Sequence, residues 1–114
     1  MSTIGFLDKF GFGYKVYFTV TSGPSSYSAG GFTVTVPNAN KIHGAIAVYL
    51  GSSDYLAQIN DSFPKTGNTV KIMVRENIEQ AVNEGGTATY TIGKEVADGT
   101  DLSSLSFFVL VIYE

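Results

Sequence analysis

The chain has 114 residues, 44% of them hydrophobic and 15% charged, and its 7 Lys and Arg against 10 Asp and Glu give a formal net charge of −3. The absence of Cys excludes disulfides and thiolate metal sites. With only one Arg and no apolar run near the ~18 residues of a membrane-spanning helix, neither a nucleic-acid partner nor a membrane partner is expected. Isolated soluble domains carry about 25% charged residues, so the low charge here predicts that a partner covers part of the surface.

Most of the chain alternates between apolar and polar residues with the period of two that is typical of strands. In chain order, strands are predicted at 14–21, 32–36, 42–50, 55–60, 69–75, 87–92 and 105–113. Turn residues such as Pro37 and the pair Gly85-Gly86 separate these strands. About 7–8 short strands at this spacing predict an all-β fold, an antiparallel β-sandwich of jelly-roll type.

One segment, 76–84, departs from the strand pattern. Its apolar residues Ile78, Ala81 and Val82 are spaced as on one side of a helix, and Asn77 is suited to cap it. We therefore expect one or two helical turns here. The alternative is that this segment belongs to a long β-hairpin arm with polar edges.

The first 13 residues form a separate apolar segment. Three Gly residues weaken both helix and strand there, and so short a segment cannot bury its Phe side chains by itself. We expect residues 1–13 to be an extended N-terminal arm that lies along its own domain, residues 14–114, or along a neighbouring subunit. If the arm docks on a neighbour, deleting it should abolish assembly and leave the domain folded.

The predicted strand 105–113 is apolar on both faces, whereas an antiparallel strand with one solvated face should alternate. We therefore expect both faces to be covered. The two sets of side chains are Phe107, Val109, Val111 and Tyr113 on one face and Phe108, Leu110 and Ile112 on the other. One set packs inside the sandwich and the other needs a partner, and the sequence does not say which. The residues predicted to make subunit contacts are Phe6, Phe10, Phe12, Phe108, Leu110 and Ile112.

Catalytic motifs are missing from this sequence. His43, the only His, falls within 42–50 on the side opposite the expected core face, so we interpret it as a surface residue. Glu95, Asp98 and Asp101 are spaced unlike a calcium-binding loop, and we interpret them as a solvated turn before the last strand. They are also the only carboxylate cluster that could serve glycoside hydrolysis. No enzymatic activity, cofactor or metal is predicted.

Loops rich in Tyr, Ser and Asn suit a sugar-binding surface, because these residues combine contact area with adaptable hydrogen bonding. Tyr27, Tyr55 and Phe63 lie in such loops. The chain has no Trp, the usual stacking platform for sugars. An extracellular, lectin-like carbohydrate-binding module with a glycan partner is therefore the alternative function.

A short all-β chain without Cys, with an apolar arm, Thr-rich strands and the turn 98–105 before a final apolar strand, resembles the small structural proteins of viruses and phages. Head decoration proteins and minor capsid or tail β-sandwiches are of this kind. The resemblance implies a multi-copy virion component, a homo-oligomer or a binder of other capsid proteins, held by subunit contacts. It transfers no functional residue, because no motif aligns.

Overall fold

The computed structural model describes residues 4–7, 13–52, 54–76, 79–82, 88–91 and 93–114. The strands within them are β1 (Ile4–Leu7), β2 (Lys15–Ser22), β3 (Phe32–Thr35), β4 (Lys41–Tyr49), β5 (Tyr55–Ile59), β6 (Lys65–Thr66), β7 (Thr69–Glu76), β8 (Glu79–Val82), β9 (Ala88–Thr91) and β10 (Ser106–Tyr113). The predicted all-β fold is confirmed. Over the described ranges the strands outnumber the expected ones, because the short strands β1, β6 and β8 carry no clear alternation. No helix in these ranges is long and apolar enough to cross a membrane.

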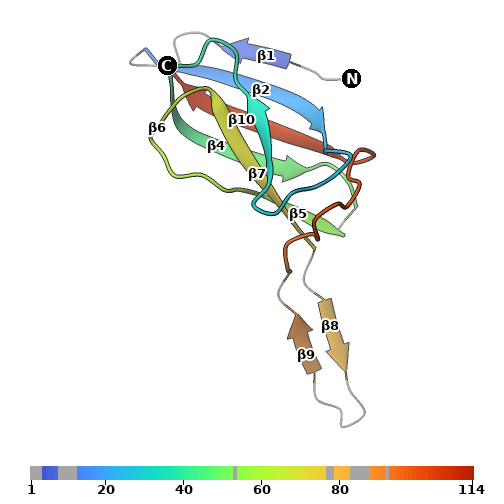
Figure 1. The fold of residues 1–114 in the computed structure, drawn as a ribbon. Helices are drawn as coiled ribbons and strands as arrows, with labels where there is room; N and C mark the ends of the chain where they lie inside the picture. Colours follow the sequence, from blue (N-terminus) through green and yellow to red (C-terminus); the bar gives the residue numbers. More distant parts are fainter. Residues whose placement is uncertain (1–3, 8–12, 53, 77–78, 83–87, 92) are drawn as a thin grey trace.

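The strands form two larger antiparallel sheets and a separate hairpin (Figure 1). The five-stranded sheet has the order β1-β2-β10-β4-β6, and the three-stranded sheet has the order β3-β7-β5. β8 and β9 pair with each other. The last strand of the chain, β10, therefore lies in the middle of the five-stranded sheet, flanked by β2 and β4.

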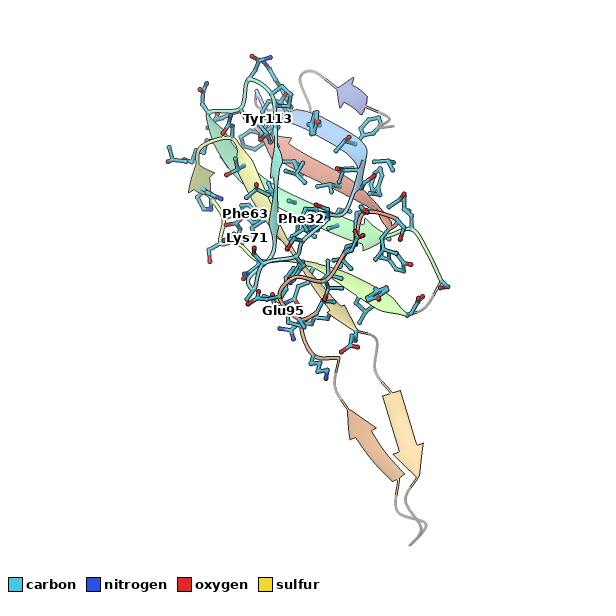
Figure 2. The ribbon with its side chains drawn as sticks, turned by 45° about the vertical axis from the view of Figure 1, so that its right-hand side comes forward. Phe32, Phe63, Lys71, Glu95 and Tyr113 are labelled. Carbon is cyan, nitrogen blue, oxygen red and sulfur yellow. The ribbon has the colours of Figure 1, made fainter. Side chains whose placement is uncertain are left out.

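The main core lies between the two larger sheets. Val109 and Val111 of β10 belong to the same packed cluster as Val70 and Ile72 of β7, and all four have no exposed surface. Phe32 of β3, labelled in Figure 2, is half-buried and packs against this cluster. Burying an aliphatic side chain of this kind stabilises a fold by about 1.5–3 kcal/mol, so this layer contributes substantially to the free energy of folding.

The two faces of β10 differ in burial. Phe107, Val109, Val111 and Tyr113 are buried and point toward the three-stranded sheet. Their neighbours along the strand, Phe108, Leu110 and Ile112, point to the opposite side and are half-buried. The set that is turned away from the core is therefore the second one.

The expectation of helical turns at 76–84 is wrong for the residues that the structure describes. Glu79–Val82 is strand β8, and Ala81 lies opposite Thr89 of β9. A single helical turn fixes several residues for few hydrogen bonds, whereas Glu79–Val82 forms a four-residue antiparallel ladder with β9, in which the β-branched Thr89 and Thr91 favour the extended backbone. The alternative, a β-hairpin arm, is confirmed. It projects from one end of the body (Figure 1), and the molecule measures 58 × 27 × 22 Å along its principal axes.

β4 turns the opposite face inward from the one expected. Ala45 and Ala47 pack against the core, whereas Ile46 and Val48 are 55% and 47% exposed. His43 was placed opposite the core face, together with Ala45 and Ala47, and that assignment of the two faces is wrong for the alanines.

The cause of this reversal is a register shift near the start of β4. Tyr113 of β10 pairs with Ile42, but Ile112 pairs with Gly44, so His43 is an additional residue in the strand. One additional residue exchanges the faces of all residues that follow it. Ile42 therefore stays fully buried while the next large aliphatic residues of β4 face outward.

Candidate contact surface

The five-stranded sheet has a second face, turned away from the core, that is apolar across three strands. Phe18 of β2 lies opposite Leu110 of β10, and Leu110 lies opposite Ile46 of β4. Residues opposite one another in neighbouring strands share a face, so the rows merge into one surface. The side chains of this surface, called the outer face below, are Val16, Phe18, Val20, Phe108, Leu110, Ile112, Ile46 and Val48. Val16, opposite Ile112 at one end, is buried.

Exposure on the outer face increases toward β4. The side chains on β2 and β10 partly cover one another, as in the pair Phe18 and Phe108, whose ring centroids are 6.3 Å apart. On β4 and just beyond it, Ile46, Val48 and Leu50 make up three of the four large hydrophobic residues that are exposed in the described part of the chain. Contiguous apolar surface of this kind is typical of an interaction site.

The outward face of the three-stranded sheet has the opposite character. Thr33 of β3 lies opposite Lys71 of β7, and Leu56 of β5 lies opposite Arg75. Arg75 Nε donates a hydrogen bond of 2.9 Å to Gln58 Oε1. Leu56, at 45% exposure, is the one exposed large hydrophobic residue among the described residues of this face. Its paired residue is charged, so this face is mainly polar, as expected of the solvated side of an antiparallel sheet.

Three of the six predicted contact residues, Phe108, Leu110 and Ile112, lie on the outer face. Phe6 lies in β1, at the edge of the same sheet and opposite Tyr17 of β2. Phe10 and Phe12 lie outside the described residues. Within Ile4–Leu7, the N-terminal segment therefore runs along its own domain, which is one of the two expected arrangements.

Sequence reasoning missed the rest of the outer face. Phe18 and Val20 alternate with Tyr17 and Thr19, and it is the second pair that points inward, with exposures of 5% and 3%. Alternation identifies the residues that share a face, but not which face is inward. In β2 and β4, the two strands that flank β10, the apolar rows face outward, on the same side as the half-buried row of β10. The alternation in these strands therefore identified the two rows but suggested the wrong one as the core face.

His43 lies at one end of the five-stranded sheet in a small cluster of side chains. Its ring stacks near Tyr14 with centroids 4.4 Å apart, and its Nε2 lies 3.2 Å from Glu114 Oε1. The side chain is 21% exposed. These contacts tie β4 to the residues that flank β2 and β10, which is a structural role.

Glu95 links three segments near the end of the body from which the hairpin projects (Figure 2). The Tyr27 hydroxyl donates to Glu95 Oε2 at 2.7 Å and accepts from the Val74 N–H at 3.1 Å. Glu95 Oε2 also accepts the Gly30 N–H at 2.6 Å. Burial, followed by the hydrogen bond to Glu95, raises the pKa of Tyr27 to about 12. The hydrogen bonds from Tyr27 and then Gly30 lower the pKa of Glu95 below its ordinary value.

The other two carboxylates of the predicted turn, Asp98 and Asp101, each accept hydrogen bonds from a different loop segment. Asp98 Oδ1 accepts the Ala29 N–H at 2.6 Å. Asp101 Oδ1 accepts the N–H and hydroxyl of Ser103 at 2.9 and 2.6 Å. Within the described ranges, no group of three or more His, Cys, Asp and Glu side chains could hold a metal ion.

Tyr27→Phe should destabilise the fold by about 1–3 kcal/mol, because the buried Val74 N–H loses its acceptor. Because the pKa of Tyr27 is raised, its contribution is complete below pH about 10 and is lost as the pH rises toward about 12. Urea denaturation of both proteins at pH 8 and at pH 11 measures this. An equal decline of the two proteins between these pH values would contradict the role given to the hydroxyl.

A hollow of about 310 Å³ lies beside the base of the hairpin. Tyr55, Glu76, Glu95 and Thr100 are among the residues that line it. Of the three aromatic residues proposed for sugar binding, Tyr55 alone lines this hollow. Tyr27 is 1% exposed, and Phe63 packs against the main core.

Comparison with known proteins adds no relative: no family model, no curated protein and no solved structure matches the chain.

Proposed function

We propose that this chain is a structural assembly protein, a multi-copy component of a virion, and that the outer face is its subunit contact. The observation that carries the proposal is the contrast between the two sheets. One turns a polar face to solvent, and the other turns outward a face that includes Ile46 at 55% and Val48 at 47% exposure. The virion itself comes from the resemblance to small capsid and decoration proteins.

The free energy of burying apolar surface favours a covered outer face. Removing apolar surface from water is worth roughly 25 cal/mol per Å², and an uncovered apolar sheet face promotes aggregation. The strands that carry the outer face also explain part of the low charge of the chain, since β10 (Ser106–Tyr113) contains no charged residue. A contact surface accounts for both features together.

We further propose that the two sheets form a β-sandwich of jelly-roll type. The support is the strand order. The last strand, β10, returns to lie beside β2, and β3, β7 and β5 make the second layer. A return of this kind is what Greek-key connections produce. Jelly rolls of this kind occur in viral capsids, which agrees with the proposed function.

Val48→Lys should weaken association of the purified chain by about tenfold or more, because it places a charge that must be desolvated in the contact. Val48 is 47% exposed, so the monomer should stay folded. The measurement is light scattering over a concentration series, with electron microscopy of any assembled species. Thr35→Lys, on the exposed outward side of β3, is the matched control and should leave association unchanged.

A wild-type chain that remains a 12.2 kDa monomer at millimolar concentration, and that binds no particle of other proteins through this face, would contradict the proposed contact. Equal weakening by Val48→Lys and Thr35→Lys would instead point to a general effect of charge.

The hollow beside the hairpin supports one alternative, the lectin-like carbohydrate-binding module. It combines an aromatic side chain, Tyr55, with the carboxylates of Glu76 and Glu95, and its volume is at the small end for ligand pockets. If this alternative holds, a glycan array probed with and without Ca²⁺ should give hits that Tyr55→Ala abolishes. An array without hits would argue against it.

A further inference from the structure

We propose that the outer face binds the outer face of a second copy of this chain, the two copies being related by a two-fold axis that passes near Leu110. This inference rests on the proposed function and adds the identity of the partner and the symmetry of the contact. Its grounds are the arrangement of the chain around the outer face, the charge on that face and its area.

No described segment of the chain itself is placed to cover the outer face. β1 pairs with β2 at the edge of the sheet rather than lying across it. The hairpin continues from β7, in the other sheet, and projects beyond the end of the body (Figure 1). The described parts of the chain therefore leave the outer face open to a second molecule.

The charge pattern favours a second copy. In a two-fold contact the same patch occurs on both sides, and a residue near the axis meets its own counterpart. A charged residue there would face its like, which is strongly unfavourable. All outward positions of β10, from Ser106 to Ile112, are uncharged, as are Phe18 and Val20 of β2 and Ile46 and Val48 of β4. The outer face therefore meets itself without electrostatic repulsion.

The area fits the lower end of specific contacts. β2 and β10 have eight residues each and β4 has nine. At about 3.3 Å per residue and about 4.8 Å between strands, the three strands cover roughly 400 Å² of each copy in projection. The relief of the side chains raises the accessible area above this projection. A face-to-face pair therefore approaches the ~1,000 Å² that a specific contact needs.

The absence of Cys makes the contact directly testable, because a single introduced Cys has only its counterpart in another copy as a partner. Leu110 lies in the central strand of the outer face, paired with Phe18 on one side and Ile46 on the other. Leu110→Cys should be joined into covalent dimers by a short bifunctional maleimide, at least tenfold more than Thr35→Cys on the other sheet. Light scattering of the wild-type chain should give the mass of two copies or a multiple of it.

Each other outcome has a distinct meaning. If Val48→Lys prevents association but Leu110→Cys cross-links no better than Thr35→Cys, the outer face meets a different surface. The two-fold contact is then wrong and the proposed function stands. The same holds if the chain alone is monomeric and Val48→Lys blocks its binding to a particle made of other proteins. A monomer that binds nothing through this face overturns both proposals.

Discussion

Phe107→Ala should destabilise the fold by about 3–5 kcal/mol, the cost of truncating a large buried aromatic residue. Phe107 has no exposed surface. Its ring lies 5.4 Å from that of Phe32 and 5.6 Å from that of Tyr49, measured between centroids, so it joins the two sheets. Domains of this size are stable by about 5–15 kcal/mol in total, and the variant should be close to unfolding at 37 °C. Urea denaturation followed by far-UV circular dichroism measures the loss.

Phe108→Ala is the matched control, one residue further along β10. Phe108 is half-buried on the outer face, so its truncation should cost the monomer only about 1 kcal/mol, part of the transfer free energy of a Phe side chain. Both variants should be measured at low protein concentration, where association adds little to stability. Equal losses for the two variants would contradict the assignment of the two faces of β10.

Gly31→Ala should cost the fold roughly 2–6 kcal/mol, because two penalties combine at this position. Its φ angle of +119° lies in a region that L residues rarely adopt, at a cost of about 1–3 kcal/mol. An added Cβ would also meet the Ile72 carbonyl oxygen and lie 2.7 Å from the Ile72 carbonyl carbon. Ile72 is fully buried in β7, so making room for the methyl group costs about 1–3 kcal/mol more.

Gly67→Ala separates these two penalties. Gly67 has a φ of +124°, but an added Cβ would meet nothing within 4 Å. It should therefore show the backbone penalty alone, about 1–3 kcal/mol. The comparison is made from the shift in the urea midpoint at equal slope. A loss for Gly67→Ala as large as that for Gly31→Ala would show that the close approach to Ile72 is unimportant.

The strands could be predicted from the sequence because alternation depends on neighbours along the chain. The orientation of β4 could not, since it is set by the additional residue at His43, which only the pairing with β10 reveals. The sequence does not decide between helix and hairpin for a similar reason. Its spacing of Ile78, Ala81 and Val82 suits a helix locally, and the strand that pairs with β8 decides otherwise.

The candidate surface was half predictable. The row of Leu110 could be identified because the last strand is apolar on both faces, whereas an antiparallel strand with one solvated face should alternate between apolar and polar residues. The link between Tyr27 and Glu95 was not, because 68 residues separate them in the chain and no local pattern connects them. The same link explains why the tyrosine of an apparently polar loop is buried and cannot offer its ring to a sugar.

Two backbone hydrogen bonds close the base of the hairpin. The Glu76 N–H donates to the Lys94 carbonyl at 2.9 Å, and the Val96 N–H donates to the Val74 carbonyl at 3.0 Å. These bonds hold the two ends of segment 77–93 side by side within the body. Since the entropy of closing a longer loop grows only slowly with its length, a change in the length of segment 77–93 should cost the body little stability. The two sheets and their shared core are therefore closed independently of what this segment carries.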